Sequence, residues 1–444
     1  MSNKTNSNTS APSISTPRIR TYIFYISLYF LDSFSRKSSL SIPDSFCYCM
    51  AVRFLAREVS DLCLGKPALR SIPISATVAD ALSALKRSGE SYVSVWNCDH
   101  SSAAARKTDC RCVGKVCMVD VICFLCRVTN LLSPSLALQS PISDLLPKVP
   151  GLVRHLESHS SLLEAIDYII EGAQNLVVPI ESNLSITSTK KHLNKQPSSF
   201  GCSTLHNGRE FCWLTQEDVV RFLLNSIGVF SPLPALTIES LNVIDTDPMT
   251  IYYDKPASSV VDFISRSFIE QKSIGVVDEC HRLIGEISPY TLACSDETAA
   301  AAITTLSAGD LMAYIDYGGP PEDLVQLVKS RLEEKKLGSM LELMEEISVS
   351  SLSSSSSCSS DEDFGFRSGG AGWYSPARRS EPIVCHPCSS LVAVMIQALV
   401  HRSSYIWVVE ENYSIVGIVT FSGILKVFRS VAGVRQKPEG ENSF

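Results

Sequence analysis

"NYSIVGIVTFSGILKVF", residues 412–428, has the pattern of a strand that ends at a threonine and passes directly into a helix. β-Branched residues fill the strand, as is typical of a buried strand: Ile415, Val416, Ile418 and Val419. Thr420 stands at the position of a helix N-cap, just before an apolar run that begins at Ile424. An acidic residue often follows such a threonine three residues later, but here that position holds Gly423. The stretch therefore predicts a capped strand–helix junction without the accompanying carboxylate.

This unit occurs four times in the chain. The three further copies are "DCRCVGKVCMVDVICFL" (109–125), "GREFCWLTQEDVVRFLL" (208–224) and "CHRLIGEISPYTLAC" (280–294). A block with a polar cap, an apolar helix face and a strand precedes every copy, over residues 77–97, 160–181, 256–279 and 388–411. Three copies also have a short polar-then-apolar start: "VSDLCLGKP" (59–67), "ISDLLPKVP" (142–150) and "SAGDLMAYI" (307–315). Each unit thus reads helix, strand, helix, strand, strand, helix, which predicts four tandem α/β modules separated by insertions.

The layout resembles the CBS domain, the module named after cystathionine β-synthase, whose signature is a strand ending G-I-[VI]-T followed by x-x-D and an apolar helix. The resemblance covers 59–126, 142–226, 235–294 and 306–431, which we number repeats 1 to 4. The whole chain is similar to plant proteins built only of CBS repeats, and distantly to the γ subunits of AMP-activated protein kinases. The resemblance implies an α/β fold class of α+β modules arranged as two pseudo-twofold Bateman pairs. These pairs would be 51–228 and 235–432, joined by the short linker "FSPLPALT" (230–237).

The resemblance also implies a ligand. In ligand-binding family members, the threonine and aspartate of T-x-x-D contact the phosphate and ribose of an adenine nucleotide. A helix N-terminus suits an anion, and a carboxylate can accept both ribose hydroxyls. Only Thr215 and Asp218 form the full pair; Asp120 lacks the threonine, and Ser288 and Thr420 lack the acid. If any cleft binds a nucleotide, we expect it to be the one bordered by Thr215 and Asp218, although the same spacing also caps a helix with no ligand, which is the favoured interpretation.

Composition and motifs favour a non-catalytic role. The 444 residues carry a formal net charge of −7 and only 19% charged residues, which gives no reason to expect nucleic acid or an anionic membrane as a partner. No apolar run is long enough to span a membrane, and the sequence contains no phosphate-binding loop, G-x-G-x-x-G or G-x-S-x-G. We therefore expect a regulatory or adaptor protein, not an enzyme, that senses an adenosine-type ligand or regulates a partner enzyme such as a protein kinase, with no cofactor beyond that ligand. The alternatives are a structural scaffold with empty clefts and a thiol redox catalyst that uses Cys385 and Cys388.

The sixteen cysteines lie mostly in apolar runs, which is typical of a reducing compartment where cysteine serves as a small hydrophobic residue. "CFLC" (123–126) lies on the predicted helix of repeat 1 and is interpreted as core. "CDHSSAAARKTDCRC" (98–112) could hold zinc through Cys98, His100, Cys110 and Cys112, although these spacings are unusual for zinc. "HLESH" (155–159) lacks the order of a zinc-protease helix, so its histidines are predicted to be polar loop residues.

Three segments lie outside the repeated pattern. Residues 1–49 are either a targeting segment or a mis-assigned start, because Met50 opens a fresh sequence. The predicted location is the cytoplasm or nucleus, or a plastid or mitochondrion if the extension is a transit peptide. Within repeat 4, residues 320–347 form a predicted helical insert. Packing on its own domain is the favoured interpretation, and docking of a partner is the alternative. The serine-rich residues 348–379 form a predicted disordered loop. Three serines in or beside this loop are candidate phosphorylation sites: Ser359, Ser360 and Ser380.

Overall fold

The computed structural model describes residues 44–88, 91–98, 110–180, 204–316, 319–354 and 381–433. The chain divides into two units, Met1–Cys49 and Met50–Phe444, and the fold below is that of the second. Among the helices described, none combines the length and apolar character needed to cross a membrane. Several predicted features lie outside the described residues: most of the extension, His100, Ser359, Ser360 and Ser380.

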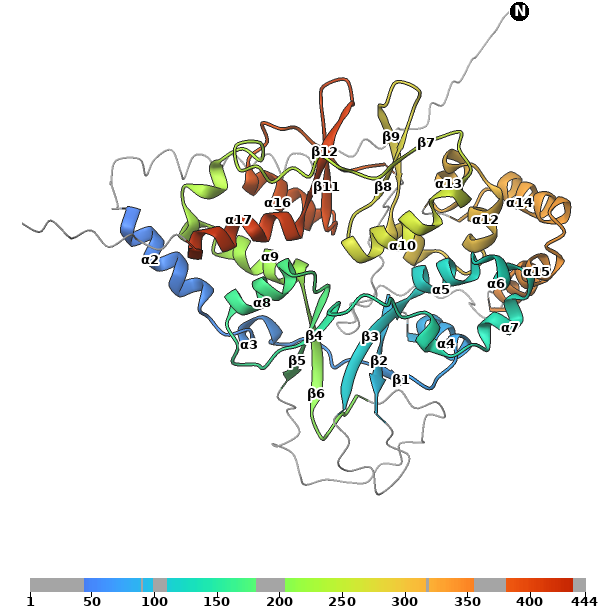
Figure 1. Cartoon of the computed structure of the whole chain (residues 1–444), viewed down its shortest axis with the longest axis horizontal. Helices are drawn as coiled ribbons and strands as arrows, with labels where there is room; N and C mark the ends of the chain where they lie inside the picture. Colours follow the sequence, from blue (N-terminus) through green and yellow to red (C-terminus); the bar gives the residue numbers. More distant parts are fainter. Residues whose placement is uncertain are drawn as a thin grey trace, which may run out of the picture. The chain divides into compact units, whose positions relative to one another are not determined.

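Four small sheets of three strands form the framework (Figure 1). In every sheet the first strand runs parallel to the second, and the second runs antiparallel to the third. Repeat 1 consists of β1 (Ser71–Pro73), α4 (Val78–Ser88), β2 (Tyr92–Asn97), β3 (Arg111–Cys117) and α5 (Met118–Leu125). Repeat 2 consists of β4 (Val153–His155), α8 (Leu162–Ile170), β5 (Asn175–Ile180), β6 (Glu210–Thr215) and α9 (Gln216–Asn225).

The second half of the chain repeats this order of elements. Repeat 3 consists of β7 (Thr250–Tyr252), the 3-10 helix η5 (Ala257–Val260), α10 (Val261–Glu270), β8 (Ile274–Val277), β9 (Leu283–Ile287) and α11 (Pro289–Cys294). Repeat 4 consists of β10 (Val384–Cys385), α16 (Leu391–Val400), β11 (Tyr405–Val409), β12 (Ile415–Thr420) and α17 (Phe421–Gly433). The predicted fold class, a chain of four α/β modules, is therefore confirmed.

Local capping explains why the first helix of most repeats begins where it does. The backbone N–H groups of Asp80, Glu164 and Ala393 donate to the hydroxyl oxygens of Thr77, Ser161 and Ser390, respectively. Each bond satisfies an N–H group that has no partner within its helix. Repeat 3 differs, because η5 replaces the capped first turn there.

The repeats pair through their sheets. In the first pair, Trp96 on β2 is buried together with Val177 on β5 and Trp213 on β6. In the second pair, Trp407 on β11 is buried with Leu283 on β9. These contacts join repeat 1 to repeat 2 and repeat 3 to repeat 4, as the sequence predicted.

The short segment that starts each repeat packs on the other repeat of its pair. Helix α3 (Ser60–Cys63) contacts β5 and β6, and the Val59 N–H donates to the Ser160 carbonyl oxygen (2.9 Å). In return, the Ile142 N–H of the 3-10 helix η1 (Ile142–Asp144) donates to the Ala76 carbonyl oxygen (2.8 Å). The predicted boundaries at 59, 142, 235 and 306 instead keep each start with the repeat that follows it. The exchange occurs because the buried apolar residue of each start covers the partner's core.

The second pair makes the same exchange. The Ile238 N–H of repeat 3's start donates to the Ser389 carbonyl oxygen of repeat 4 (2.9 Å). The Leu306 carbonyl oxygen, just before α13 (Ala308–Tyr314), accepts from the Ala257 N–H of repeat 3 (3.0 Å). Both pairs are therefore held by reciprocal backbone hydrogen bonds as well as by their sheets.

Helices then join one pair to the other through two large cores. Helix α5 of repeat 1 packs against α10 and α11 of repeat 3, and α8 and α9 of repeat 2 pack against α17 of repeat 4. The second core also contains the end of α2 (Asp44–Leu55) and both ends of the 3-10 helix η3 (Ile227–Phe230). Leu233 of the 3-10 helix η4 (Leu233–Ala235) packs against this core. The Phe230 ring packs edge-on against Phe54 and Phe428, at centroid distances of 5.7 and 4.9 Å. The predicted linker 230–237 is thus packed into this core.

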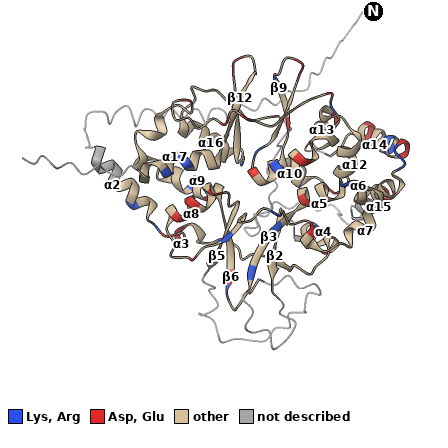
Figure 2. Cartoon of the chain, in the orientation of Figure 1, with Lys and Arg blue, Asp and Glu red and all other residues tan. Residues whose placement is uncertain are grey.

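The insert of repeat 4 does not pack where the sequence placed it. It forms two helices, α14 (Glu322–Glu334) and α15 (Gly338–Ser354), and α14 carries acidic and basic residues together (Figure 2). They contact α12 (Ala299–Thr305), α6 (Val128–Leu132) and α7 (Pro134–Leu138) in the core of repeats 1 and 3. The reason is that the insert follows repeat 4's start, which lies on repeat 3. Because α15 continues to Ser354, the prediction of a disordered loop from residue 348 is wrong for its first residues; 355–380 lie outside the described part.

The contact between β12 and the start of repeat 3 gives a test of this arrangement. Asp245 and Ile418 exchange two backbone hydrogen bonds of 2.9 Å, and a Cβ on the adjacent Gly417 would overlap the Asp245 carbonyl oxygen. We expect Gly417→Ala to lower the free energy of unfolding by about 2 kcal/mol, because backbone must move to admit the methyl group. Gly338→Ala is the control: its Cβ meets nothing within 4 Å at the start of α15. Equal thermal unfolding midpoints for the two variants would contradict the close contact between Gly417 and Asp245.

Candidate functional site

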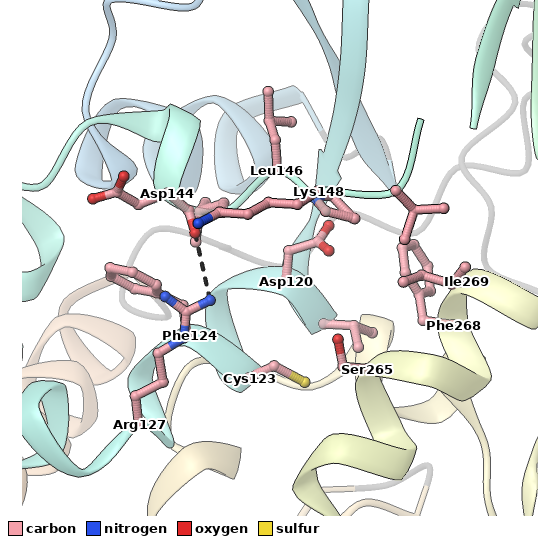
Figure 3. Close-up of a pocket in the computed structure, with 14 residues that line it drawn as sticks. Asp120, Cys123, Phe124, Arg127, Asp144, Leu146, Lys148, Ser265, Phe268 and Ile269 are labelled. Atoms are coloured by element: carbon pink, nitrogen blue, oxygen red, sulfur yellow. Dashed lines mark hydrogen bonds between the residues drawn. The ribbon is translucent and has the colours of Figure 1, made fainter. Parts of the chain in front are cut away.

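A cavity of about 460 Å³ lies between α5 of repeat 1, the segment after η1, and α10 of repeat 3 (Figure 3). We call it the repeat 1–3 cavity. Its walls include Val119, Asp120, Cys123, Phe124, Arg127, Asp144, Leu145, Leu146, Pro147, Lys148, Val149, Ser265, Phe268 and Ile269. Its volume falls in the range of small-molecule sites in proteins.

Asp120 supplies a carboxylate to this cavity from the first turn of α5. Cys117 is the N-cap residue of α5, and its backbone N–H donates to Asp120 Oδ2 (2.8 Å). Burial raises the pKa of Asp120 to about 6, although the hydrogen bond from Cys117 and the nearby Lys115 ammonium oppose this rise. The carboxylate is therefore mostly ionised at neutral pH, at a helix N-terminus.

Two cationic side chains and two aromatic rings also line the cavity. The Arg127 guanidinium lies over the Phe124 ring (4.9 Å to its centroid) and donates to the Asp144 carbonyl oxygen (3.5 Å). Lys148 is exposed and forms no ion pair within the described part of the chain. Phe268 adds a second ring, over which the Lys115 ammonium lies at 5.2 Å. An anion and a planar apolar group would both find complementary side chains here.

Thr215 and Asp218, the pair that the motif favoured, form a complete capping box at the start of α9. Asp218 Oδ2 accepts from the Thr215 N–H (2.8 Å) and from its hydroxyl (2.7 Å). The same oxygen accepts from the Lys66 ammonium (2.5 Å), which also donates to the Trp213 carbonyl oxygen (2.9 Å). Lys66 belongs to the start of repeat 1, which lies on repeat 2. This carboxylate oxygen is thus used by three donors of the protein itself.

Ser288 and Thr420 also cap their helices. Ser288 is 1% exposed; its hydroxyl oxygen accepts from the Tyr290 N–H (3.1 Å) and lies 3.1 Å from the Tyr405 hydroxyl oxygen. Thr420 Oγ1 accepts from the Gly423 N–H (3.1 Å). The candidate residues Asp120, Asp218, Ser288 and Thr420 therefore stand at four separate helix starts and do not form one shared site.

Glu286 is a buried carboxylate that no sequence motif indicated. It lies on β9 and is 4% exposed. Its two oxygens accept from the Tyr405 hydroxyl (3.0 Å) and the Trp407 indole N–H (2.8 Å) of repeat 4. Because these bonds cross between the sheets, Glu286 helps to fix the pairing of repeats 3 and 4.

Three other residues that the sequence analysis discussed lie in or beside packed parts of the fold. Cys385 is buried on β10, and burial raises the pKa of its thiol to about 12, so it stays protonated at neutral pH. Cys123 is only half-buried at the cavity wall, so the prediction that "CFLC" is core holds only in part. His155 lies on β4, and its Nε2 accepts from the Cys112 N–H (3.1 Å). The prediction that His155 is a loop residue is wrong, because the strand pairs it with Val177.

The Lys66–Asp218 pair can be tested as a structural element. Both side chains are about a quarter exposed (21% and 25%), which places the pair between surface and buried ion pairs. We expect Lys66→Ala to lower the free energy of unfolding by about 1–2 kcal/mol. In an Asp218→Asn background the same substitution should cost less, because its partner charge is gone.

Lys255→Ala is the matched control, since Lys255 pairs with Asp254 where both side chains are 56% exposed. It should change the free energy of unfolding by less than about 0.5 kcal/mol. Equal losses for the two lysine variants in denaturant unfolding would show that Asp218 is not held by Lys66.

The paired sheets, exchanged starts and capped helix junctions define a tandem CBS-domain protein. The chain belongs to the family of CBS domain-containing proteins: it is 49% identical over 393 residues to CBS domain-containing protein CBSX5 of Arabidopsis thaliana, covering 86% of this chain and 98% of that protein. It is 20% identical over 395 residues to the SNF1-related protein kinase regulatory subunit gamma-like PV42b of the same plant, covering 85% and 96%. Protein MJ1225 of Methanocaldococcus jannaschii is a similar solved structure, with a TM-score of 0.49, 15% identity and coverage of 84% and 99%. No family model matches the chain.

Proposed function

We propose that the chain is a non-catalytic regulatory protein that binds an adenosine-type ligand in the repeat 1–3 cavity and regulates a partner enzyme, a protein kinase. The observation that carries this proposal is the combination in one cavity of a helix-start carboxylate, two cations and two aromatic rings. Membership of the CBS domain family supports a regulatory role. The similarity to PV42b, which is named as a gamma-like regulatory subunit of an SNF1-related protein kinase, supports a kinase as the partner.

Each part of an adenine nucleotide has a matching group in the cavity. The Asp120 carboxylate would accept hydrogen bonds from the two ribose hydroxyls. Arg127 and Lys148 would pair with phosphate oxygens, Arg127 through its planar guanidinium. The partly buried ring of Phe268 would contact the purine, whereas Phe124 is 4% exposed and its ring lies under Arg127. The ligand is thus recognised by its sugar, its charge and its ring.

The cleft at Thr215 and Asp218 remains the site that the sequence motif predicted. A ribose that used Asp218 Oδ2 would have to share this oxygen with the Lys66 ammonium or displace it. Removing a charge-assisted hydrogen bond of this kind costs about 1.5–3 kcal/mol. We therefore place the ligand at Asp120 and use Asp218 as the competing site in the test.

A structural scaffold is the second candidate function. The observation that favours it is that Thr215, Ser288 and Thr420 all use their hydroxyl oxygens to cap helices. In this alternative the clefts stay empty and only the surface contacts a partner. Ligand binding separates the two functions.

Isothermal titration of the full chain with adenosine, AMP, ATP and S-adenosylmethionine tests the ligand. We expect at least one of them to bind, and Asp120→Asn to weaken its affinity about tenfold to a hundredfold, because the carboxylate acceptor is lost. Asp218→Asn is the matched variant: it should lower the unfolding temperature, because it weakens a cap, and leave the affinity unchanged. If none of the four probes binds up to millimolar concentration, the structural scaffold would be the remaining candidate function. Loss of binding in Asp218→Asn alone would assign the ligand to the Thr215 site.

The raised pKa of Asp120 predicts how binding depends on pH. Protonation removes the carboxylate's capacity to accept two hydroxyls, so affinity should fall as the pH drops through about 6. Adenosine is the suitable probe, because the phosphate of AMP itself titrates near pH 6. We expect its affinity to fall about tenfold per pH unit below this pKa and to stay constant above it. The same slope in Asp120→Asn would show that another group causes the dependence.

A further inference from the structure

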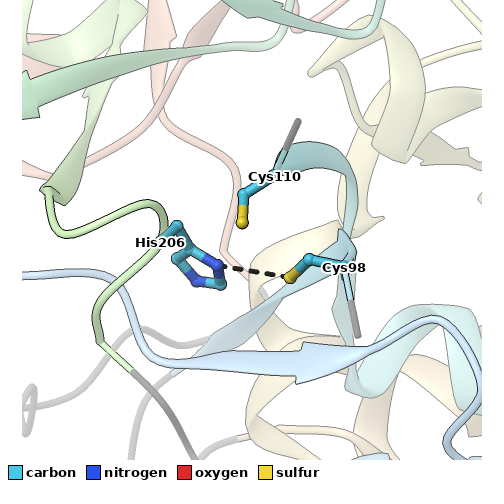
Figure 4. Close-up of side chains that lie close together, drawn as sticks. All are labelled: Cys98, Cys110 and His206. Carbon is cyan, nitrogen blue, oxygen red and sulfur yellow. Dashed lines mark hydrogen bonds between the residues drawn. The ribbon is translucent and has the colours of Figure 1, made fainter. Parts of the chain in front are cut away.

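Three potential metal ligands meet where repeat 1 contacts repeat 2. Cys98 follows β2, Cys110 precedes β3, and His206 comes from the segment before β6 (Figure 4). Their two sulfur atoms and the imidazole nitrogen all lie within 4.8 Å of one another. Cys98 Sγ and His206 Nδ1 are 3.4 Å apart. The cluster therefore joins the two repeats at the edge of their sheet interface.

We propose that Cys98, Cys110 and His206 form a Zn²⁺ site that links repeat 1 to repeat 2. Zinc prefers thiolate and imidazole ligands in tetrahedral geometry, with Zn–S of about 2.3 Å and Zn–N of about 2.0 Å. These bond lengths imply a separation of about 3.5 Å between a sulfur and a nitrogen ligand, close to the observed distance from Cys98 to His206. A fourth position is left for water or another donor, as at zinc sites with three protein ligands.

The surroundings of His206 hold its ring in the orientation that such a site needs. The side chain is 1% exposed and stacks on the Trp96 indole, with centroids 3.5 Å apart and an interplanar angle of 5°. His206 Nε2 lies 3.0 Å from Ser71 Oγ. When Nδ1 binds the metal, Nε2–H donates to this hydroxyl oxygen, and such an outer hydrogen bond fixes the tautomer of metal-ligating histidines.

The ligand set differs from the one that the sequence suggested, which was Cys98, His100, Cys110 and Cys112. The Cys112 thiol is 2% exposed and donates to the Gly114 carbonyl oxygen (3.4 Å). Cys112 is not one of the three residues whose ligand atoms lie within 4.8 Å of one another. His100 lies outside the described residues. The nitrogen ligand is His206 of repeat 2, in place of the His100 that the sequence suggested.

The metal site is separate from the site of the proposed function. Cys110 stands just before β3, whose seven residues run to Cys117 at the start of α5, where Asp120 lies. At about 3.3 Å per residue, the strand puts roughly 20 Å between the two ends. Zinc binding can therefore succeed or fail independently of nucleotide binding. When Zn²⁺ binds, the two thiols release their protons to the solvent and His206 binds as the neutral imidazole.

Cobalt substitution and zinc analysis test the proposal on the full chain, purified under reducing conditions. We expect about one Zn²⁺ per chain after dialysis against trace zinc, and a Co²⁺ form with thiolate charge-transfer bands and the intense visible bands of tetrahedral cobalt. Cys98→Ser and Cys110→Ser should each lose most of the bound metal and weaken the charge-transfer band. His206→Asn should lose metal as well, but the cysteine variants carry the test, because His206 is buried against Trp96.

Cys280→Ser is the matched control, because Cys280 is an exposed cysteine in the corresponding β8–β9 hairpin of repeat 3. It should keep the full metal content and the cobalt spectrum. A reduced wild-type chain that binds no more zinc or cobalt than Cys98→Ser would overturn the proposal. So would a Cys98–Cys110 disulfide, found by thiol alkylation and mass analysis, that persists in reductant.

Discussion

The fold depends on one constraint: a sheet of three short strands with two helices cannot bury its own apolar surface. The strands here are at most seven residues long, and an isolated unit of this size would leave Trp96 or Trp407 in water. Each repeat therefore covers its sheet with the sheet of a second repeat and its helices with those of a third. The exchanged starts add to this cover, because each inserts a buried residue such as Val59 or Ile142 into its partner's core.

The repeated modules could be predicted from the sequence because their signals are local. A capping hydroxyl, a β-branched strand and a helical stripe all lie within about twenty residues of one another, so their fourfold recurrence indicates four modules and their pairs. The exchange of the starts could not be predicted, because the chain segment after residue 58 is adjacent in sequence to repeat 1 and in space to repeat 2. The insert was misplaced for the same reason: its position follows from α13, which lies on repeat 3.

For the candidate sites, too, local sequence signals could not show which side chains meet from distant parts of the chain. The T-x-x-D spacing indicated Thr215 and Asp218 because it records a capping box, and the structure contains that box. Which donors this carboxylate has depends also on Lys66, which lies far away in the sequence and in another repeat. Asp120 had the weaker motif, with Cys117 in place of threonine, but it borders a cavity. His206 escaped notice because its ligand partners are in repeat 1.

The position of the repeat 1–3 cavity suits regulation better than a cleft inside one pair would. Its walls come from α5 and the segment after η1 in the first pair, and from α10 in the second. A ligand there would contact both pairs at once, through Asp120 and Arg127 on one side and Phe268 on the other. Such a ligand shifts the arrangement of the pairs only by the difference between its affinities for the two arrangements. A ligand held wholly within one pair would lack these contacts with the second pair and so would have less means of moving it.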